Sequence, residues 1–137
     1  MPVIDASVVV DALVTVGPPG QAARAELRGL AALEVPGILA AEVTSALRAM
    51  VSRAGLSPAR AARALDQTCA LRLVQYPFEP FSTRVWELRG NLTVYDAWYV
   101  ALAERLGTEL VTADQRLAGA AGPRCPIRLA GQPEARS

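Results

Sequence analysis

The sequence predicts an α/β fold in which a parallel β-sheet is sandwiched between helices. Short apolar stretches alternate along the chain with stretches of helical periodicity, and no hairpin dipeptide joins two of the apolar stretches. The apolar stretches are nearly continuous in hydrophobic residues, which is typical of parallel strands buried on both faces. In sheets of this kind, ligands bind beyond the carboxyl ends of the strands.

The first half of the chain contains one expected strand followed by helices. Gly17-Pro18-Pro19-Gly20 predicts a break. One apolar stripe, which includes Leu39, Val43 and Leu47, gives the clearest helical periodicity, and Gly55 ends that helix. Ser57 is expected to cap the next helix, with proline at its first position. The expected elements are a strand over 2–4, helices over 6–14 and 21–32, a loop closed by Val35-Pro36, and helices over 38–53 and 58–71.

The second half alternates strands and helices more regularly. Tyr76-Pro77 ends a strand, and Thr93-Val94-Tyr95-Asp96 resembles a capping box that opens an almost wholly apolar helix ending at Gly107. The expected strands are 72–75, 109–112 and 127–129, and the expected helices are 79–89, 94–106 and 115–120. We expect a single domain over residues 1–130 and a flexible tail over 131–137.

Composition excludes several kinds of chemistry. The chain has 137 residues and no histidine, and all 14 of its basic residues are arginine. Histidine-based triads, histidine zinc sites and lysine chemistry are therefore excluded. Cys69 and Cys125 are too few for a cysteine zinc site. Because no basic leader precedes the apolar start and no apolar run would span a membrane, we expect a soluble cytoplasmic protein with reduced thiols.

Four acidic residues occupy positions that sequence predicts to be buried or at strand ends. Asp5 and Asp114 follow expected strands, Glu42 lies beside the apolar stripe of its helix, and Asp96 lies in the first turn of the most apolar helix. Each has an ordinary structural explanation. The aspartates are common helix caps, and Glu42 has the position of a boundary residue whose carboxylate reaches water.

Taken together, the four acids favour a cation site. Carboxylates placed close together repel one another unless they are protonated or screened by cations. An all-oxygen site selects Mg²⁺ or Mn²⁺, which promote phosphodiester hydrolysis. Ser7, Thr93 and Thr112 lie near these acids and would orient a carboxylate, or else cap the local backbone. Asp11, which is six residues past Asp5, and Asp66 are expected at the surface, and Trp98 and Tyr99 are expected in the core of their apolar helix.

The order of these motifs is that of a known family. VIDASVVV, ILAAEVTSAL, LTVYDAWYVALAERLG and ELVTADQRL follow one another along residues 1 to about 130. The chain resembles the PIN-domain ribonucleases, and most closely the VapC-type toxins of type II toxin–antitoxin modules. The resemblance implies a PIN-like three-layer α/β/α sandwich with a central parallel sheet of four to five short strands.

The resemblance also implies a site, a substrate and partners. Asp5, Glu42, Asp96 and Asp114 match the acids that hold one or two Mg²⁺ or Mn²⁺ ions in the family, and Ser7 and Thr112 match hydroxyl positions that support them. The family cleaves RNA, often a tRNA or rRNA, so the implied function is a metal-dependent endoribonuclease. The resemblance also implies that the protein forms a homodimer and binds a cognate VapB-type antitoxin, and that it does not associate with a membrane. Candidate RNA-binding arginines are Arg48, Arg53, Arg89 and Arg116.

Two alternatives stay open at this point. The chain would be a catalytically silent PIN-like binding module if its acids serve only as helix caps. The same metal chemistry would also act on DNA flaps or on small phosphate esters.

Overall fold

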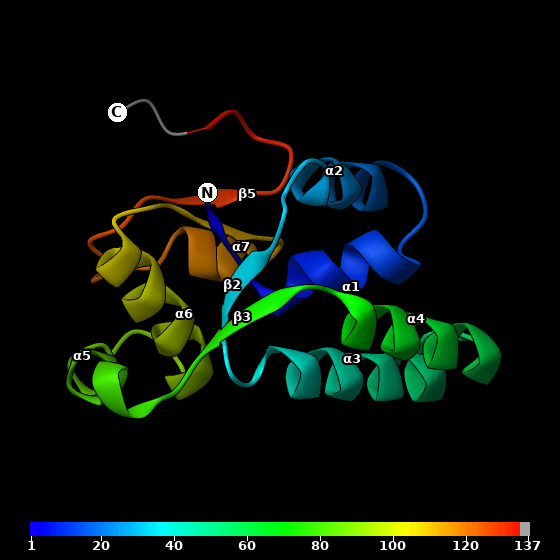
Figure 1. Cartoon of the computed structure of the whole chain (residues 1–137), viewed down its shortest axis with the longest axis horizontal. Helices are drawn as coiled ribbons and strands as arrows, with labels where there is room; N and C mark the ends of the chain where they lie inside the picture. Colours follow the sequence, from blue (N-terminus) through cyan, green and yellow to red (C-terminus); the bar gives the residue numbers. More distant parts are fainter. Residues whose placement is uncertain (135–137) are drawn as a thin grey trace.

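The computed structural model describes residues 1–134 and has an α/β/α arrangement. In Figure 1, helices α1 to α4 lie to one side of the strands, and α5 and α6 lie to the other. The strands are β1 (Val3–Ile4), β2 (Leu33–Pro36), β3 (Leu73–Tyr76), β4 (Leu110–Thr112) and β5 (Ile127–Leu129). The α-helices are α1 (Ala6–Val14), α2 (Pro18–Leu27), α3 (Leu39–Arg53), α4 (Pro58–Ala70), α5 (Ser82–Glu87), α6 (Val94–Leu106) and α7 (Gln115–Ala118), and a 3₁₀ turn, η1, covers Glu79–Phe81.

All the strand pairs are parallel, which confirms the predicted fold class. Hydrogen bonds join β1, β4 and β5 in the order β1-β4-β5, and a separate ladder joins β2 to β3. Val3 pairs with Leu110, and Leu33 pairs with Leu73. Strand β2 packs beside β1, so the two ladders lie next to each other. The five strands are thus divided between two ladders, a division that the hydrophobic pattern does not reveal.

Several element boundaries were predicted wrongly. Strand β2 occupies residues that were expected to form a loop closed by Val35-Pro36. Its pairing with β3 continues beyond the strand, where the Gly37 amide donates to the Tyr76 carbonyl at 2.9 Å. Helix α2 begins at Pro18, inside the expected break, because proline fits the first turn of a helix. The expected helix 79–89 is a 3₁₀ turn followed by the short α5, and α7 ends two residues early.

The predicted helix caps are present. The Ser57 hydroxyl accepts a hydrogen bond from the Arg60 amide at 3.2 Å at the start of α4. The Thr93 hydroxyl accepts one from the Asp96 amide at 3.2 Å at the start of α6, and Gly107 ends α6 with a φ of 65°. These caps fix where α6 starts, and with it the position of Asp96.

Helix α6 is the centre of the hydrophobic core. Every residue from 97 to 103 is buried, and the helix packs against β1, β2 and β4. Trp98 and Tyr99 both belong to this core, as their apolar surroundings in the sequence predicted. No described helix has the length and apolar character that crossing a bilayer requires.

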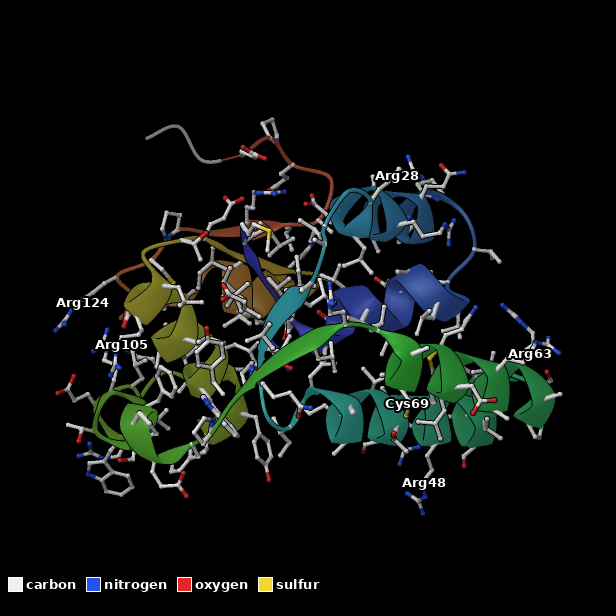
Figure 2. All side chains as sticks on the ribbon, in the orientation of Figure 1. Arg28, Arg48, Arg63, Cys69, Arg105 and Arg124 are labelled. Carbon is white, nitrogen blue, oxygen red and sulfur yellow. The ribbon has the colours of Figure 1, made fainter. Side chains whose placement is uncertain are left out.

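Outside the core, the cysteines are free and the labelled arginines are dispersed. Cys69 is exposed and Cys125 is partly buried, and neither forms a disulfide. In Figure 2, Arg28, Arg48, Arg63 and Arg124 project from different sides of the molecule. The expected tail begins at residue 131, and the part of it over 135–137 lies outside the described residues.

Candidate active site

The four predicted acids meet around one open pocket of about 500 Å³. Asp5 follows β1, Asp114 follows β4, Glu42 lies in the first turn of α3, and Asp96 lies in the first turn of α6. Two parallel strands therefore deliver acids to the same edge, and two helices supply the others. The pocket lies at the carboxyl ends of these strands, as expected for this class of sheet.

Asp5 is held by two hydroxyl groups at the bottom of this pocket. Asp5 is only 6% exposed. Its Oδ2 accepts hydrogen bonds from Ser7 Oγ at 2.6 Å and from Thr112 Oγ1 at 2.8 Å. The same hydroxyls accept from the loop after β4, Ser7 from the Ala113 amide and Thr112 from the Asp114 amide. Asp5 precedes α1 but its side chain makes no capping hydrogen bond to that helix.

Asp114 and Thr93 have capping roles. Asp114 Oδ1 accepts from the Arg116 amide at 2.8 Å and so caps α7, although the residue also lines the pocket. Thr93 caps α6 through the backbone of Asp96, and it is not among the described residues that line the pocket. The capping explanation therefore applies to Thr93 and in part to Asp114, but not to the side chain of Asp5.

Burial and mutual repulsion make the pocket unfavourable for its own negative charge. Burial raises the pKa of Asp5, and the hydroxyls of Ser7 and Thr112 partly oppose this. Burial and then the charge of Asp5 raise the pKa of Asp96. Burial, with smaller effects from the charges of Asp5 and Asp96, raises the pKa of Glu42 to about 7, although Tyr99 partly opposes this. A cation in the pocket would relieve this repulsion.

The donor set of the pocket fits a hard cation, but the side chains do not form a finished cage. Every titratable group that lines it is a carboxyl, and Oε1 of Glu42 is buried without a hydrogen-bond partner. Carboxylate oxygens are the ligands that Mg²⁺ and Mn²⁺ prefer. Within residues 1–134, however, no three acidic or cysteine side chains are grouped as a metal site. Binding a cation therefore requires the carboxylates to turn toward a common point.

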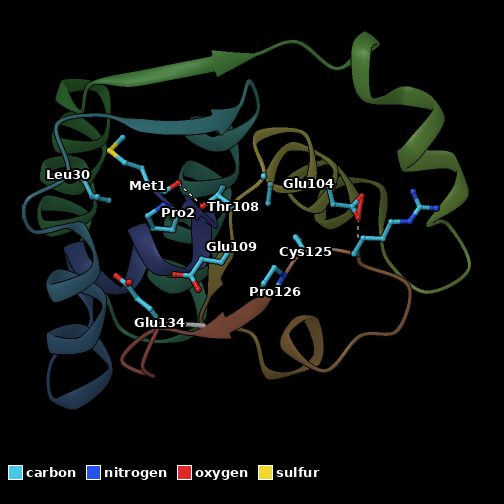
Figure 3. Close-up of a pocket in the computed structure, with 12 residues that line it drawn as sticks. Met1, Pro2, Leu30, Glu104, Thr108, Glu109, Cys125, Pro126 and Glu134 are labelled. Carbon is cyan, nitrogen blue, oxygen red and sulfur yellow. Dashed lines mark hydrogen bonds between the residues drawn. The ribbon is translucent and has the colours of Figure 1, made fainter. Parts of the chain in front are cut away.

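A larger cavity of about 860 Å³ lies at the opposite edge of the sheet, at the amino ends of β1, β4 and β5 (Figure 3). Two of its three glutamates, Glu104 and Glu109, are used in structural pairs. Glu104 accepts from Arg84 at 2.7 Å and from the Arg124 amide at 2.9 Å, and Glu109 pairs with Arg128 at 2.9 Å. This cavity lacks the repelling acids of the smaller pocket, which is therefore the candidate active site.

Comparison with known proteins identifies the family. The PIN domain family model matches residues 3–123. The chain is 42% identical to VapC ribonuclease Mb0985 of Mycobacterium bovis, over 94% of this chain and 98% of that protein. It is 44% identical to ribonuclease VapC1 of Mycobacterium tuberculosis, over 93% of this chain and 96% of the relative. The chain belongs to the VapC group of the PIN-domain family.

A solved structure supports the fold of this VapC-family chain. The fold of this chain is similar to the crystal structure of PAE2754 from Pyrobaculum aerophilum, with a TM-score of 0.63 and 27% sequence identity. The likeness covers 91% of this chain and 81% of the other. The part matched by the PIN domain model contains all four predicted acids and ends before β5.

Sequence reasoning missed one residue that lines this VapC-family pocket and one that lies behind it. Asp11 was expected at the surface but lines the pocket, with Oδ1 accepting from the Thr15 hydroxyl at 2.7 Å. The missed signal is its position four residues after Ser7, because residues four apart share one face of a helix. Tyr99 was assigned to the core alone, yet its hydroxyl lies near Glu42: burial is the main cause that raises the pKa of Tyr99, and the charge of Glu42 adds to it. The four candidate RNA-binding arginines are all exposed, namely Arg48, Arg53, Arg89 and Arg116.

Proposed function

We propose that this VapC-family protein is a metal-dependent endoribonuclease that acts as the toxin of a toxin–antitoxin pair. Its similar relatives are named as ribonucleases. The observation that carries the metal-dependent part is the convergence of Asp5, Glu42, Asp96 and Asp114, from four elements, around one pocket. The pKa values of Asp5, Glu42 and Asp96 are raised by burial and by neighbouring acids, and a bound cation would compensate this repulsion.

In this proposal the four carboxylates have different roles. Asp5, Asp96 and Asp114 would hold one or two Mg²⁺ or Mn²⁺ ions, with Glu42 as a further ligand or as the group that orients and deprotonates the attacking water. When bound, the ions would lower the pKa of the attacking water and stabilise the charge that develops on the phosphate. Ser7 and Thr112 fix the orientation of Asp5 through its Oδ2. Without a cation the pKa of Glu42 is about 7, and a cation nearby would lower it, so that Glu42 would be ionised and able to accept a proton near neutral pH.

The alternative of a silent binding module makes a different use of the same acids. It requires the aspartates to act as helix caps, and Asp114 does cap α7. The side chain of Asp5 does not cap α1, although it is buried at the pocket. A buried carboxylate that performs no capping is better explained by a ligand than by helix stability.

We further propose that the substrate is a tRNA or rRNA and that the protein acts in the cytoplasm. The proposed partners are a second copy of the chain and a cognate VapB-type antitoxin. The support is apolar surface that would gain from being covered, including two residues beside Asp96. The exposed large hydrophobic residues are Met1, Val16, Val74, Trp86, Val94 and Tyr95.

Cleavage of total RNA by the purified, antitoxin-free protein tests this function. We expect fragments with Mg²⁺ or Mn²⁺ and none with EDTA, and fragment ends that identify the target. Titration calorimetry should show Mn²⁺ binding by the wild type that is strongly weakened in Asp5→Asn. Intact RNA together with no Mn²⁺ binding would contradict the enzyme and favour the binding module.

A further inference from the structure

Two of the buried polar atoms in this structure have no hydrogen-bond partner and belong to neighbouring side chains. Tyr99 is fully buried in α6, and its hydroxyl has no partner. Oε1 of Glu42, on α3, is also buried and also has none. Among the described residues, the only other atom in this condition is Nε1 of Trp98. Such atoms are rare in native proteins, and each one calls for an explanation.

The two atoms have matching chemistry. The charge of Glu42, followed by that of Asp5, adds to burial in raising the pKa of Tyr99. Tyr99 in turn lowers the pKa of Glu42. These effects place the hydroxyl close to the carboxylate, although the pair lacks the geometry of a hydrogen bond. A protonated phenol is a donor and a carboxylate is an acceptor, so a small rotation of the glutamate would satisfy both atoms.

The Tyr99 ring is held in place by the core, whereas the Glu42 side chain has more freedom to rotate. The ring of Tyr99 is enclosed by the core, and one helical turn separates it from Asp96. Glu42 has a longer and more flexible side chain, and it lines the pocket. Because Oε1 is the buried oxygen, Oε2 is the oxygen available to the pocket. A fixed donor at Oε1 would therefore set the direction of Oε2.

We propose that Tyr99 is a positioning residue for Glu42, and that its hydroxyl donates a hydrogen bond to Oε1 when the pocket is loaded with its cation. The inference rests on the proposed function, because it gives Glu42 a place in the reaction. Tyr99 touches neither substrate nor cation in this arrangement. It acts through Glu42 alone, by holding the carboxylate in the orientation that the reaction needs.

The test compares two matched Tyr→Phe variants. Tyr99→Phe removes the hydroxyl and keeps the buried ring. The control, Tyr76→Phe, removes a hydroxyl that donates to Glu34 Oε1 at 3.0 Å, in a Tyr–Glu pair that does not line the pocket. With the most rapidly cleaved RNA from a total-RNA digest, we expect Tyr99→Phe to lower kcat by about tenfold or more, the usual effect of losing a hydrogen bond to a charged group, with little change in KM. The control should match the wild type.

Two further measurements separate positioning from a structural role. In titration calorimetry, Tyr99→Phe should weaken Mn²⁺ binding while its melting temperature stays close to that of the wild type, because the lost hydroxyl has no partner in the unloaded protein. In a Glu42→Gln background, Tyr99→Phe should cause no further loss of kcat. The wild type also offers a spectroscopic readout: a slowly exchanging hydroxyl proton that appears in NMR spectra on adding Mg²⁺ and is missing from Glu42→Ala, which has no acceptor at this place.

The outcomes of these experiments distinguish failure of the Tyr99 role from failure of the proposed nuclease function. If Tyr99→Phe binds Mn²⁺ and cleaves RNA like the wild type, or if its effect is equally large in the Glu42→Gln background, the positioning role is overturned while the nuclease stands. Absence of the Mg²⁺-dependent hydroxyl proton would also overturn it. If Glu42→Gln is fully active, or if the wild type binds no Mn²⁺, the proposed function itself fails.

Discussion

The Thr112 hydroxyl donates a 2.8 Å hydrogen bond to Oδ2 of Asp5 and so links the ends of β4 and β1, which are 107 residues apart in the chain. The bond is fully buried, and the same hydroxyl accepts from the Asp114 amide at 3.1 Å. One side chain of the sheet therefore orients one pocket acid and fixes the backbone of another. This arrangement makes the geometry of the pocket depend on the register of β1 against β4.

Replacing Thr112 with valine should damage both stability and the pocket. Valine keeps the shape of the side chain but leaves Oδ2 of Asp5 and the Asp114 amide each short of a partner. We expect the free energy of unfolding to fall by about 1–3 kcal/mol in a denaturant titration. Thr108→Val is the control, because that hydroxyl donates only to the Met1 carbonyl at an exposed site. Equal losses in the two variants would contradict the special role of Thr112.

Stability in EDTA should depend on pH through Glu42. The folded protein holds the Glu42 proton up to a pKa of about 7, whereas the unfolded chain releases it near the ordinary value of 4.5. Between these values the folded state binds more protons, so the free energy of unfolding falls as pH rises. Melting temperatures from pH 5 to pH 8 should decline, and less steeply in Glu42→Gln. An unchanged slope in that variant would show that Glu42 is not the group responsible.

The Arg128 ion pairs should be a major contribution to stability away from the pocket. Arg128 is 8% exposed and pairs with Glu26 on α2 at 2.5 Å and with Glu109 at 2.9 Å. Arg128→Met would remove the cation that pairs with both carboxylates, and breaking a buried ion pair typically costs about 3–5 kcal/mol. Urea unfolding would measure this loss. Mn²⁺ binding should persist at temperatures where the variant is folded, since Arg128 does not line the pocket.

Asp11→Asn should show whether the additional acid belongs to the working site. Asp11 lines the pocket, and only Oδ1 is used by Thr15. Asparagine can keep the bond from the Thr15 hydroxyl while removing a negative charge. We expect weaker Mn²⁺ binding with the melting temperature preserved. Binding identical to the wild type would show that Asp11 is an ordinary surface residue, as the sequence predicted.

The fold was largely predictable because the helices carry strong local signals. The stripe of α3, the Ser57 and Thr93 caps and Gly107 are all set by residues close in sequence. Strand β2 was missed because it is defined by pairing with β3, about 40 residues away, and it ends in proline. Local patterns do not contain that pairing.

The sequence predicted those pocket acids that lie at the ends of strands or in the first turns of helices. Asp5, Glu42, Asp96 and Asp114 were selected because each conflicted with an apolar setting, and the fold brings all four to one pocket. Asp11 and the Tyr99 hydroxyl were missed for a different reason. Asp11 was judged by its separation from Asp5, which precedes the helix, and Tyr99 was judged by its apolar neighbours. Both depend on the three-dimensional arrangement of α1, α3 and α6.

A paired cleavage assay on total RNA with Mg²⁺ or Mn²⁺ tests directly whether the Asp5 carboxylate is needed for metal-dependent cleavage. It compares Asp5→Asn with Asp66→Asn, a matched change at an exposed aspartate on α4. Asp5→Asn should abolish cleavage and should melt no lower than the wild type, because it removes a buried charge. Asp66→Asn should cleave normally. Full cleavage by Asp5→Asn, or cleavage by the wild type that persists in EDTA, would contradict this role of Asp5 in metal-dependent cleavage.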